Sequence, residues 1–112
     1  MVDVEQRRYP RANPPKGLVV AWQCGTERTV SFLENLGLGG MFVVTRKPVA
    51  LETMVRILME LPIGEVRARA MVRRIIPQRG MGIEFIAMNQ EDRARLGRTL
   101  MPLLAGNAAS QS

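Results

Sequence analysis

The residues best suited to binding chemistry lie near the N-terminus, where arginines cluster around a proline. The cluster is Arg7-Arg8-Tyr9-Pro10-Arg11, with Arg7 and Arg11 four residues apart. Three prolines among residues 1–16 disfavour a helix and predict an extended arm. A guanidinium presents a planar fork of donors that suits phosphate oxygens and the edge of guanine. We therefore expect Arg7, Arg8 and Arg11 to hold a compact anion; a solvated basic arm is the alternative.

A second segment, Asn35-Leu36-Gly37-Leu38-Gly39-Gly40, combines an amide side chain with three glycines. Glycine between strands is costly and indicates positive φ or close approach of something to the backbone. A bulged hairpin would account for one or two of these glycines, and a ligand lying on the backbone would account for more. We expect Asn35 to hydrogen bond a ligand that Gly37, Gly39 and Gly40 allow to approach.

The residue types that the chain lacks limit the functions that it can have. It has no histidine and one cysteine, Cys24, so the commonest general base and metal ligand is missing. We expect no enzyme activity, no metal and no cofactor. The net charge of +6 favours an anionic partner without naming it. No apolar run approaches the roughly 20 residues of a membrane span and the N-terminus is polar, so we expect a cytoplasmic protein.

The elements that must position these residues follow from hydrophobic periodicity. In the clearest case Val66, Ala68, Ala70 and Val72 alternate with charged residues that include Arg67, Arg69 and Arg73, as in a half-buried antiparallel strand. Short strands about ten residues apart favour a closed barrel or a sandwich over an open sheet, because open edges aggregate. Six segments are expected to be strands: residues 18–22, 29–34, 41–44, 54–61, 65–73 and 82–86.

A helix is expected to follow the last strand. Asn89 can cap its N-terminus, and Leu96 and Leu100 can share its apolar face. Pro102 predicts a kink or an end. We thus divide the chain into a flexible arm (1–16), a barrel with a closing helix (17–104) and a disordered tail (105–112).

The order of these motifs resembles the PilZ domain family. Its Arg-x-x-x-Arg element corresponds to Arg7 and Arg11, and its Asp/Asn-x-Ser-x-x-Gly element to Asn35-x-Gly37-x-x-Gly40. The resemblance covers roughly residues 5–101 and extends to three further segments: Leu61-Pro62, Gly82-Ile83-Glu84-Phe85 and Glu91-Asp92-Arg93-x-Arg95-Leu96. It implies an all-β fold, a small six-stranded antiparallel split barrel with one C-terminal α-helix, and binding of the bacterial second messenger cyclic di-GMP.

The resemblance also implies residue roles. Arg7 and Arg11 would bind guanine edges and phosphates from the arm, and Arg8 would add a phosphate contact or stack. Asn35 would hold a guanine edge, and Arg74 would stack on a base. The family usually has serine at Gly37 and more often aspartate at position 35, so a hydroxyl and a charge are missing here. Replacing Gly37 with serine is then expected to tighten binding.

Two other functions stay open. A PilZ-like domain without nucleotide binding would act as a protein-interaction adaptor, and the glycine at position 37 favours this alternative. A small basic barrel could also bind single-stranded nucleic acid, but such sites need exposed aromatic side chains and only 4% of the residues are aromatic. Under the receptor hypothesis an effector protein is the expected second partner. Oligomeric state, ligand stoichiometry and the process controlled are left open.

Overall fold

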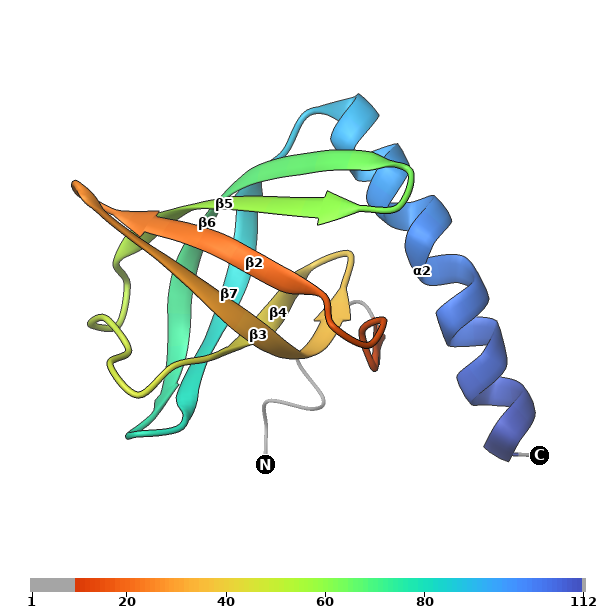
Figure 1. The fold of residues 1–112 in the computed structure, drawn as a ribbon, viewed down its shortest axis with the longest axis horizontal. Helices are drawn as coiled ribbons and strands as arrows, with labels where there is room; N and C mark the ends of the chain where they lie inside the picture. Colours follow the sequence, from red (N-terminus) through yellow and green to blue (C-terminus); the bar gives the residue numbers. More distant parts are fainter. Residues whose placement is uncertain (1–9, 112) are drawn as a thin grey trace.

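The computed structural model describes residues 10–111, with side chains to residue 105; Arg7 and Arg8 lie outside the described residues. Seven strands precede one helix within this range (Figure 1). The elements are β1 (Arg11–Ala12), β2 (Val19–Cys24), β3 (Glu27–Gly37), β4 (Gly40–Val44), β5 (Met54–Leu61), β6 (Gly64–Ile76), β7 (Gly80–Ala87) and α2 (Gln90–Gln111). Strands β2 to β7 confirm the six strands expected from periodicity.

The strands form a closed barrel. Their order is β1-β3-β2-β5-β6-β7-β4, and a further pairing of β3 with β4 closes the ring of six strands. Every pairing is antiparallel. β1 lies outside the ring and pairs with the end of β3 that β2 leaves uncovered. The expected six-stranded barrel with one C-terminal helix is therefore confirmed, with β1 as an additional short strand.

The core fills the barrel with the apolar face of each strand. On β6, Val66, Ala70 and Val72 are 0% exposed, as the alternating pattern requires. The indole of Trp22 is also buried, and its Nε1 donates a hydrogen bond to Ser31 Oγ at 3.0 Å. This bond satisfies the one polar group that the indole brings into the core.

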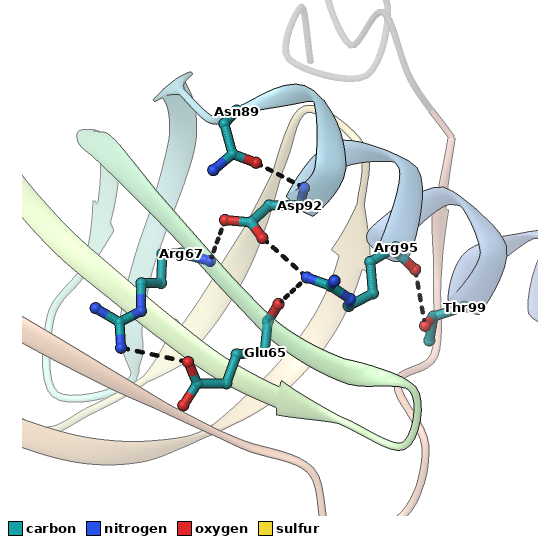
Figure 2. Close-up of polar contacts among 6 residues, drawn as sticks. All are labelled: Glu65, Arg67, Asn89, Asp92, Arg95 and Thr99. Carbon is teal, nitrogen blue, oxygen red and sulfur yellow. Dashed lines mark hydrogen bonds and ion pairs between the residues drawn. The ribbon is translucent and has the colours of Figure 1, made fainter.

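Polar contacts fasten the start of α2 to β6 (Figure 2). Asn89 Oδ1 accepts the Asp92 amide at 2.7 Å, which confirms the expected N-cap. The Asp92 carboxylate accepts the Arg67 amide at 3.2 Å and the Arg95 guanidinium at 3.0 Å. Arg95 Nη1 also donates to the Glu65 carbonyl at 2.7 Å. The helix direction is thus set by contacts with a strand that lies about 25 residues earlier in the chain.

The expected apolar face of α2 is confirmed, because Leu96 and Leu100 are 0% and 1% exposed. The helix does not end at Pro102 but continues to Gln111. Proline removes one backbone donor, yet Leu103 and Leu104 after it favour helix and pack against the core. No helix within residues 10–111 is long and apolar enough to cross a membrane. The division into arm, barrel and tail stays a prediction.

Candidate functional site

Asn35 faces outward because β3 contains a bulge. Strict alternation from the buried Leu33 would turn Asn35 inward and Leu36 outward. The pairing with β4 instead skips Glu34: Leu33 lies opposite Val43 and Asn35 opposite Phe42. One extra residue on the strand turns Glu34 and Asn35 to the same outer side and returns Leu36 to the core at 0% exposure. Asn35, Leu36 and Gly37 thus belong to β3, whereas the sequence suggested an interruption from residue 35 to residue 40.

A second bulge does the same for Arg74 on β6. Val72 lies opposite Ile83 and Arg74 opposite Gly82, so Arg73 is the extra residue. Both Arg73 and Arg74 are exposed. Without the bulge Arg74 would follow Val72 into the core, where an unpaired guanidinium is too costly to bury. The two bulges therefore decide which polar side chains the barrel offers on this face.

Arg11 and Asn35 meet across the β1–β3 pairing. Arg11 lies opposite Gly37 in that ladder, and its Nη1 donates a hydrogen bond to Asn35 Oδ1 at 2.9 Å. The Arg11 side chain also reaches Gly40, where its Nη2 lies 3.1 Å from the position that a Cβ would occupy. The two motifs singled out in the sequence, 24 residues apart, are thus joined at one place on the barrel surface.

The glycines of this site are explained by close approach of the chain to itself. None of Gly37, Gly39 and Gly40 is among the residues with positive φ. A Cβ at Gly37 would lie 2.6 Å from the Pro10 carbonyl oxygen, and one at Gly40 would lie 2.1 Å from the Ile83 carbonyl oxygen. The Gly39 carbonyl accepts the Phe85 amide at 2.8 Å. Close approach was expected correctly, but the approaching group is the protein's own backbone.

This geometry argues against one sequence-based expectation, that serine at position 37 tightens ligand binding. Serine at position 37 cannot coexist with β1 in its observed place, because its Cβ would overlap the Pro10 carbonyl. Gly37→Ser is therefore expected to displace β1 and with it Arg11, not to improve the site. The same contact explains why glycine suits this chain at that position.

Register places Asn35 and Arg74 in one row across four strands. Asn35 lies opposite Phe42, Phe42 opposite Gly82, and Gly82 opposite Arg74. Three spacings of about 4.8 Å separate the ends of the row by roughly 14 Å. The structure thus brings Arg11 and Asn35 into contact and sets Arg74 at the far end of the same outer face.

Phe42 and Arg79 belong to this face and were missed in the sequence. The Phe42 ring lies over β7, in space that a Cβ at Gly80 would occupy, and the Arg79 guanidinium covers it at 5.6 Å from the ring centroid. Arg79 is held in turn by both Glu34 carboxylate oxygens, at 2.8 and 2.7 Å. The apolar Met41-Phe42-Val43 run gave no sign that its middle residue points outward. Glycines at positions 80 and 82 were the one available signal of a bulky neighbour.

The charges of this face are largely matched within the protein. Arg73 Nε donates to Glu84 at 2.7 Å, and Arg79 pairs with Glu34. The groups brought together are guanidinium and amide donors, which bind anions and hydrogen-bond acceptors. No cluster of three or more metal-ligating side chains occurs in the described part of the chain. Guanidinium and amide donors on one face are the groups that a site for an anion with hydrogen-bonding edges requires.

Comparisons with known protein families and with solved structures both identify PilZ domains. A family model for the PilZ domain matches residues 5–101. The structure of the PilZ domain of YcgR from Escherichia coli with c-di-GMP superposes with a TM-score of 0.73 at 18% identity, covering 95% of this chain and 97% of that one. The Bacillus subtilis inhibitor of motility, MotI/DgrA, gives 0.76 at 21% identity, covering 96% of this chain but only 54% of that one.

A third structure, the PilZ domain of CeSA from a cellulose-synthesizing bacterium, gives a TM-score of 0.63 at 26% identity, covering 84% of this chain and 97% of that one. No match was found among curated proteins. The family match spans most of the chain, and the barrel agrees with these structures. The chain belongs to the PilZ domain family.

Proposed function

We propose that this PilZ domain is a non-catalytic receptor for cyclic di-GMP. Two related structures, the YcgR PilZ domain and Klebsiella MrkH, are complexes with that nucleotide. The observation that carries the proposal here is the contact between Arg11 and Asn35, which unites the Arg-x-x-x-Arg and Asn-x-Gly-x-x-Gly elements at one point. Donors from both elements thereby lie side by side on the outer side of the barrel, where one ligand would meet both.

The proposed roles follow from donor geometry. Arg11 donates one hydrogen bond to Asn35 Oδ1, and its guanidinium is the group that would bind a guanine edge or a phosphate of the ligand. Asn35 has its amide NH₂ left to donate, because its oxygen is the acceptor. Arg7 and Arg8, which lie outside the described residues, would add positive charge for the ligand. Arg74 would stack on or pair with the far end of the ligand, across Phe42 and Gly82.

Calorimetric titration with cyclic di-GMP tests this proposal. Arg11→Ala removes charge-assisted hydrogen bonds worth about 1.5–3 kcal/mol, so affinity should fall by roughly 10- to 150-fold. Asn35→Ala should weaken binding by a smaller factor, because its contact is neutral. Arg46→Ala, an exposed arginine between β4 and β5, is the matched control and should bind as the unmodified protein does. Absence of heat at high micromolar nucleotide would remove the receptor proposal.

The alternative function is that of a protein-interaction adaptor without a nucleotide. It is favoured by Gly37 and Gly40, because the close approach of the Pro10 and Ile83 carbonyls explains glycine at these two positions without a ligand. The nucleic-acid alternative stays last, because Phe32 is the exposed aromatic side chain among the described residues. A cytoplasmic location and an effector partner remain expectations of the receptor proposal.

A further inference from the structure

A second arginine-rich surface lies on the outer face of β3, β2, β5 and β6. Register places Arg28 opposite Gln23, Gln23 opposite Arg56, and Arg56 opposite Arg69. We call these four residues the basic row. Arg67 lies two residues before Arg69 on β6 and faces the same side, with its side chain 71% exposed. We call the outer face that carries Arg11, Asn35, Phe42 and Arg74 the Arg11–Asn35 face. The basic row does not cross β4 or β7, the two strands that lie between Asn35 and Arg74, so it is separate from that face.

Among the side chains that the structure describes, the arginines of the basic row have no carboxylate partner. No ion pair within the described side chains involves Arg28, Arg56 or Arg69. Arg56 and Arg69 are directly opposite in the ladder, where like charges are destabilising. One carboxylate in place of an arginine in this row would make the folded protein more stable, so stability alone does not explain the arrangement. The unmatched charge therefore points to an anionic partner from outside the molecule.

An apolar row runs parallel to the basic row. Val30 lies opposite Ala21, and Ala21 opposite Leu58. The next pair along β3 and β2 is Phe32 opposite Val19. Val30 and Phe32 are 63% and 62% exposed, and Val19 is 38% exposed. Exposed apolar side chains that lie together, rimmed by charge, mark a surface for another protein.

A groove joins the two rows to the start of α2. It has a volume of about 670 Å³ and is lined by Ala21 and Leu58, by the basic row, and on its far side by Ala87, Met88 and Asn89. Asp92 also lines the groove, but its carboxylate is engaged by Arg95 and by the Arg67 amide. Its negative charge is thus already matched, and the groove presents arginine side chains beside apolar ones.

We propose that this groove docks an acidic, partly apolar segment of a partner protein. Carboxylates of the partner would pair with Arg28, Arg56 and Arg69, and its apolar side chains would cover Val30 and Phe32. Rows on one face of a strand repeat every two residues, which matches the side-chain repeat of an extended peptide running along the strands. The proposal does not depend on nucleotide binding at the Arg11–Asn35 face.

Charge decides between this partner and the other occupants. A second copy of the chain is disfavoured, because the chain carries +6 and two basic rows facing each other would repel. Single-stranded nucleic acid would need stacking platforms, and among the described residues Phe32 alone has an exposed aromatic ring. The apolar row has no counterpart on a phosphate backbone, whereas an acidic and apolar peptide matches both rows.

Fluorescence anisotropy with a labelled peptide tests the proposal on the full chain. The probe is a short synthetic peptide with glutamates in one half and valine alternating with serine in the other. We expect Arg56→Ala/Arg69→Ala to weaken binding by at least about tenfold. The matched control, Arg46→Ala/Arg98→Ala, removes the same charge from exposed positions elsewhere and should change affinity by less than about twofold. Val30→Ser/Phe32→Ser should weaken binding while leaving its salt dependence unchanged.

The same experiment can overturn the proposal. Equal losses in both double-arginine variants would mean that net charge alone attracts the peptide. Undiminished binding of a peptide with glutamine in place of glutamate would exclude carboxylate recognition. Tighter binding of an oligodeoxythymidine that is lost in Arg56→Ala/Arg69→Ala would assign the groove to nucleic acid. If the unmodified protein does not bind the peptide at millimolar concentration, the docking proposal is wrong. Thermal unfolding of each variant checks that a loss of binding does not come from a loss of folding.

Discussion

The two arginine-bearing faces of the barrel differ in how their charges are matched. On the Arg11–Asn35 face, Arg73 pairs with Glu84 and Arg79 with Glu34. In the basic row, Arg28, Arg56 and Arg69 have no such pair among the side chains that the structure describes. The residue type is the same, so composition alone could not separate the two faces.

The difference indicates two uses of arginine. A guanidinium held by a neighbouring carboxylate has a fixed place, so it can shape a surface that receives a ligand of defined geometry. A guanidinium without a partner keeps its rotamers and its full charge, which suits a partner that adapts on binding. This difference agrees with the two proposals, a rigid cyclic nucleotide on the Arg11–Asn35 face and a peptide segment in the groove beside the basic row.

The largest expected effect is a separation of the two binding activities. Arg11→Ala should lower affinity for cyclic di-GMP by roughly 10- to 150-fold, because it removes charge-assisted contacts. It should leave peptide binding unchanged, because Arg11 lies on the Arg11–Asn35 face and not beside the basic row. Arg56→Ala/Arg69→Ala should do the reverse. Titrating both variants with both probes checks this. If either variant weakens both ligands equally, the faces are not independent.

Gly37→Ala should lower the free energy of unfolding by about 1–3 kcal/mol, since its Cβ must displace the Pro10 carbonyl or part β1 from β3. Urea denaturation measures the change. Gly97→Ala is the matched control: its Cβ would make an ordinary contact 3.9 Å from Leu38, and alanine within a helix should raise stability by about 0.5–1 kcal/mol. Unchanged stability of Gly37→Ala would show that the β1–β3 contact is not maintained in solution.

Arg69→Glu should increase stability by about 0.2–1 kcal/mol, because it places a carboxylate directly opposite Arg56 and replaces a repulsion with an attraction. The gain should shrink at high salt. Thermal unfolding at two salt concentrations measures both effects. Arg98→Glu on the exposed side of α2 makes the same charge change without an opposite arginine in the ladder and serves as the control. A loss of stability in Arg69→Glu would mean that the row is already matched.

Glu34→Gln should have the smallest effect, a loss of about 0–1 kcal/mol, because the Glu34 and Arg79 side chains are 43% and 55% exposed and solvent screens their attraction. The two variants should change stability in opposite directions. Glu34→Gln breaks an ion pair on the Arg11–Asn35 face and lowers stability, whereas Arg69→Glu creates one in the basic row and raises it. Glu27→Gln, an exposed glutamate at the start of the same strand, is the control and should leave the urea midpoint unchanged.

Much of the fold could be predicted from the sequence, because its signals are local. Alternation along residues 65–73 and the spacing of Leu96 and Leu100 fix which side chains face the core. The Asn89 cap was found for the same reason, since it acts within three residues. The Arg-x-x-x-Arg and Asn35–Gly40 segments were also singled out by residue type and spacing alone.

The tertiary structure decided what these local signals leave free. Whether Asn35 and Arg74 face outward depends on bulges at Glu34 and Arg73, and a bulge arises from how two distant strands pair. The basic row likewise exists only through the register of four strands. The sequence by itself determined a barrel, its helix and a binding motif. Only long-range strand pairing determined which of the described arginines face a carboxylate and which face another arginine, because pairing energy depends on side chains far apart in the chain.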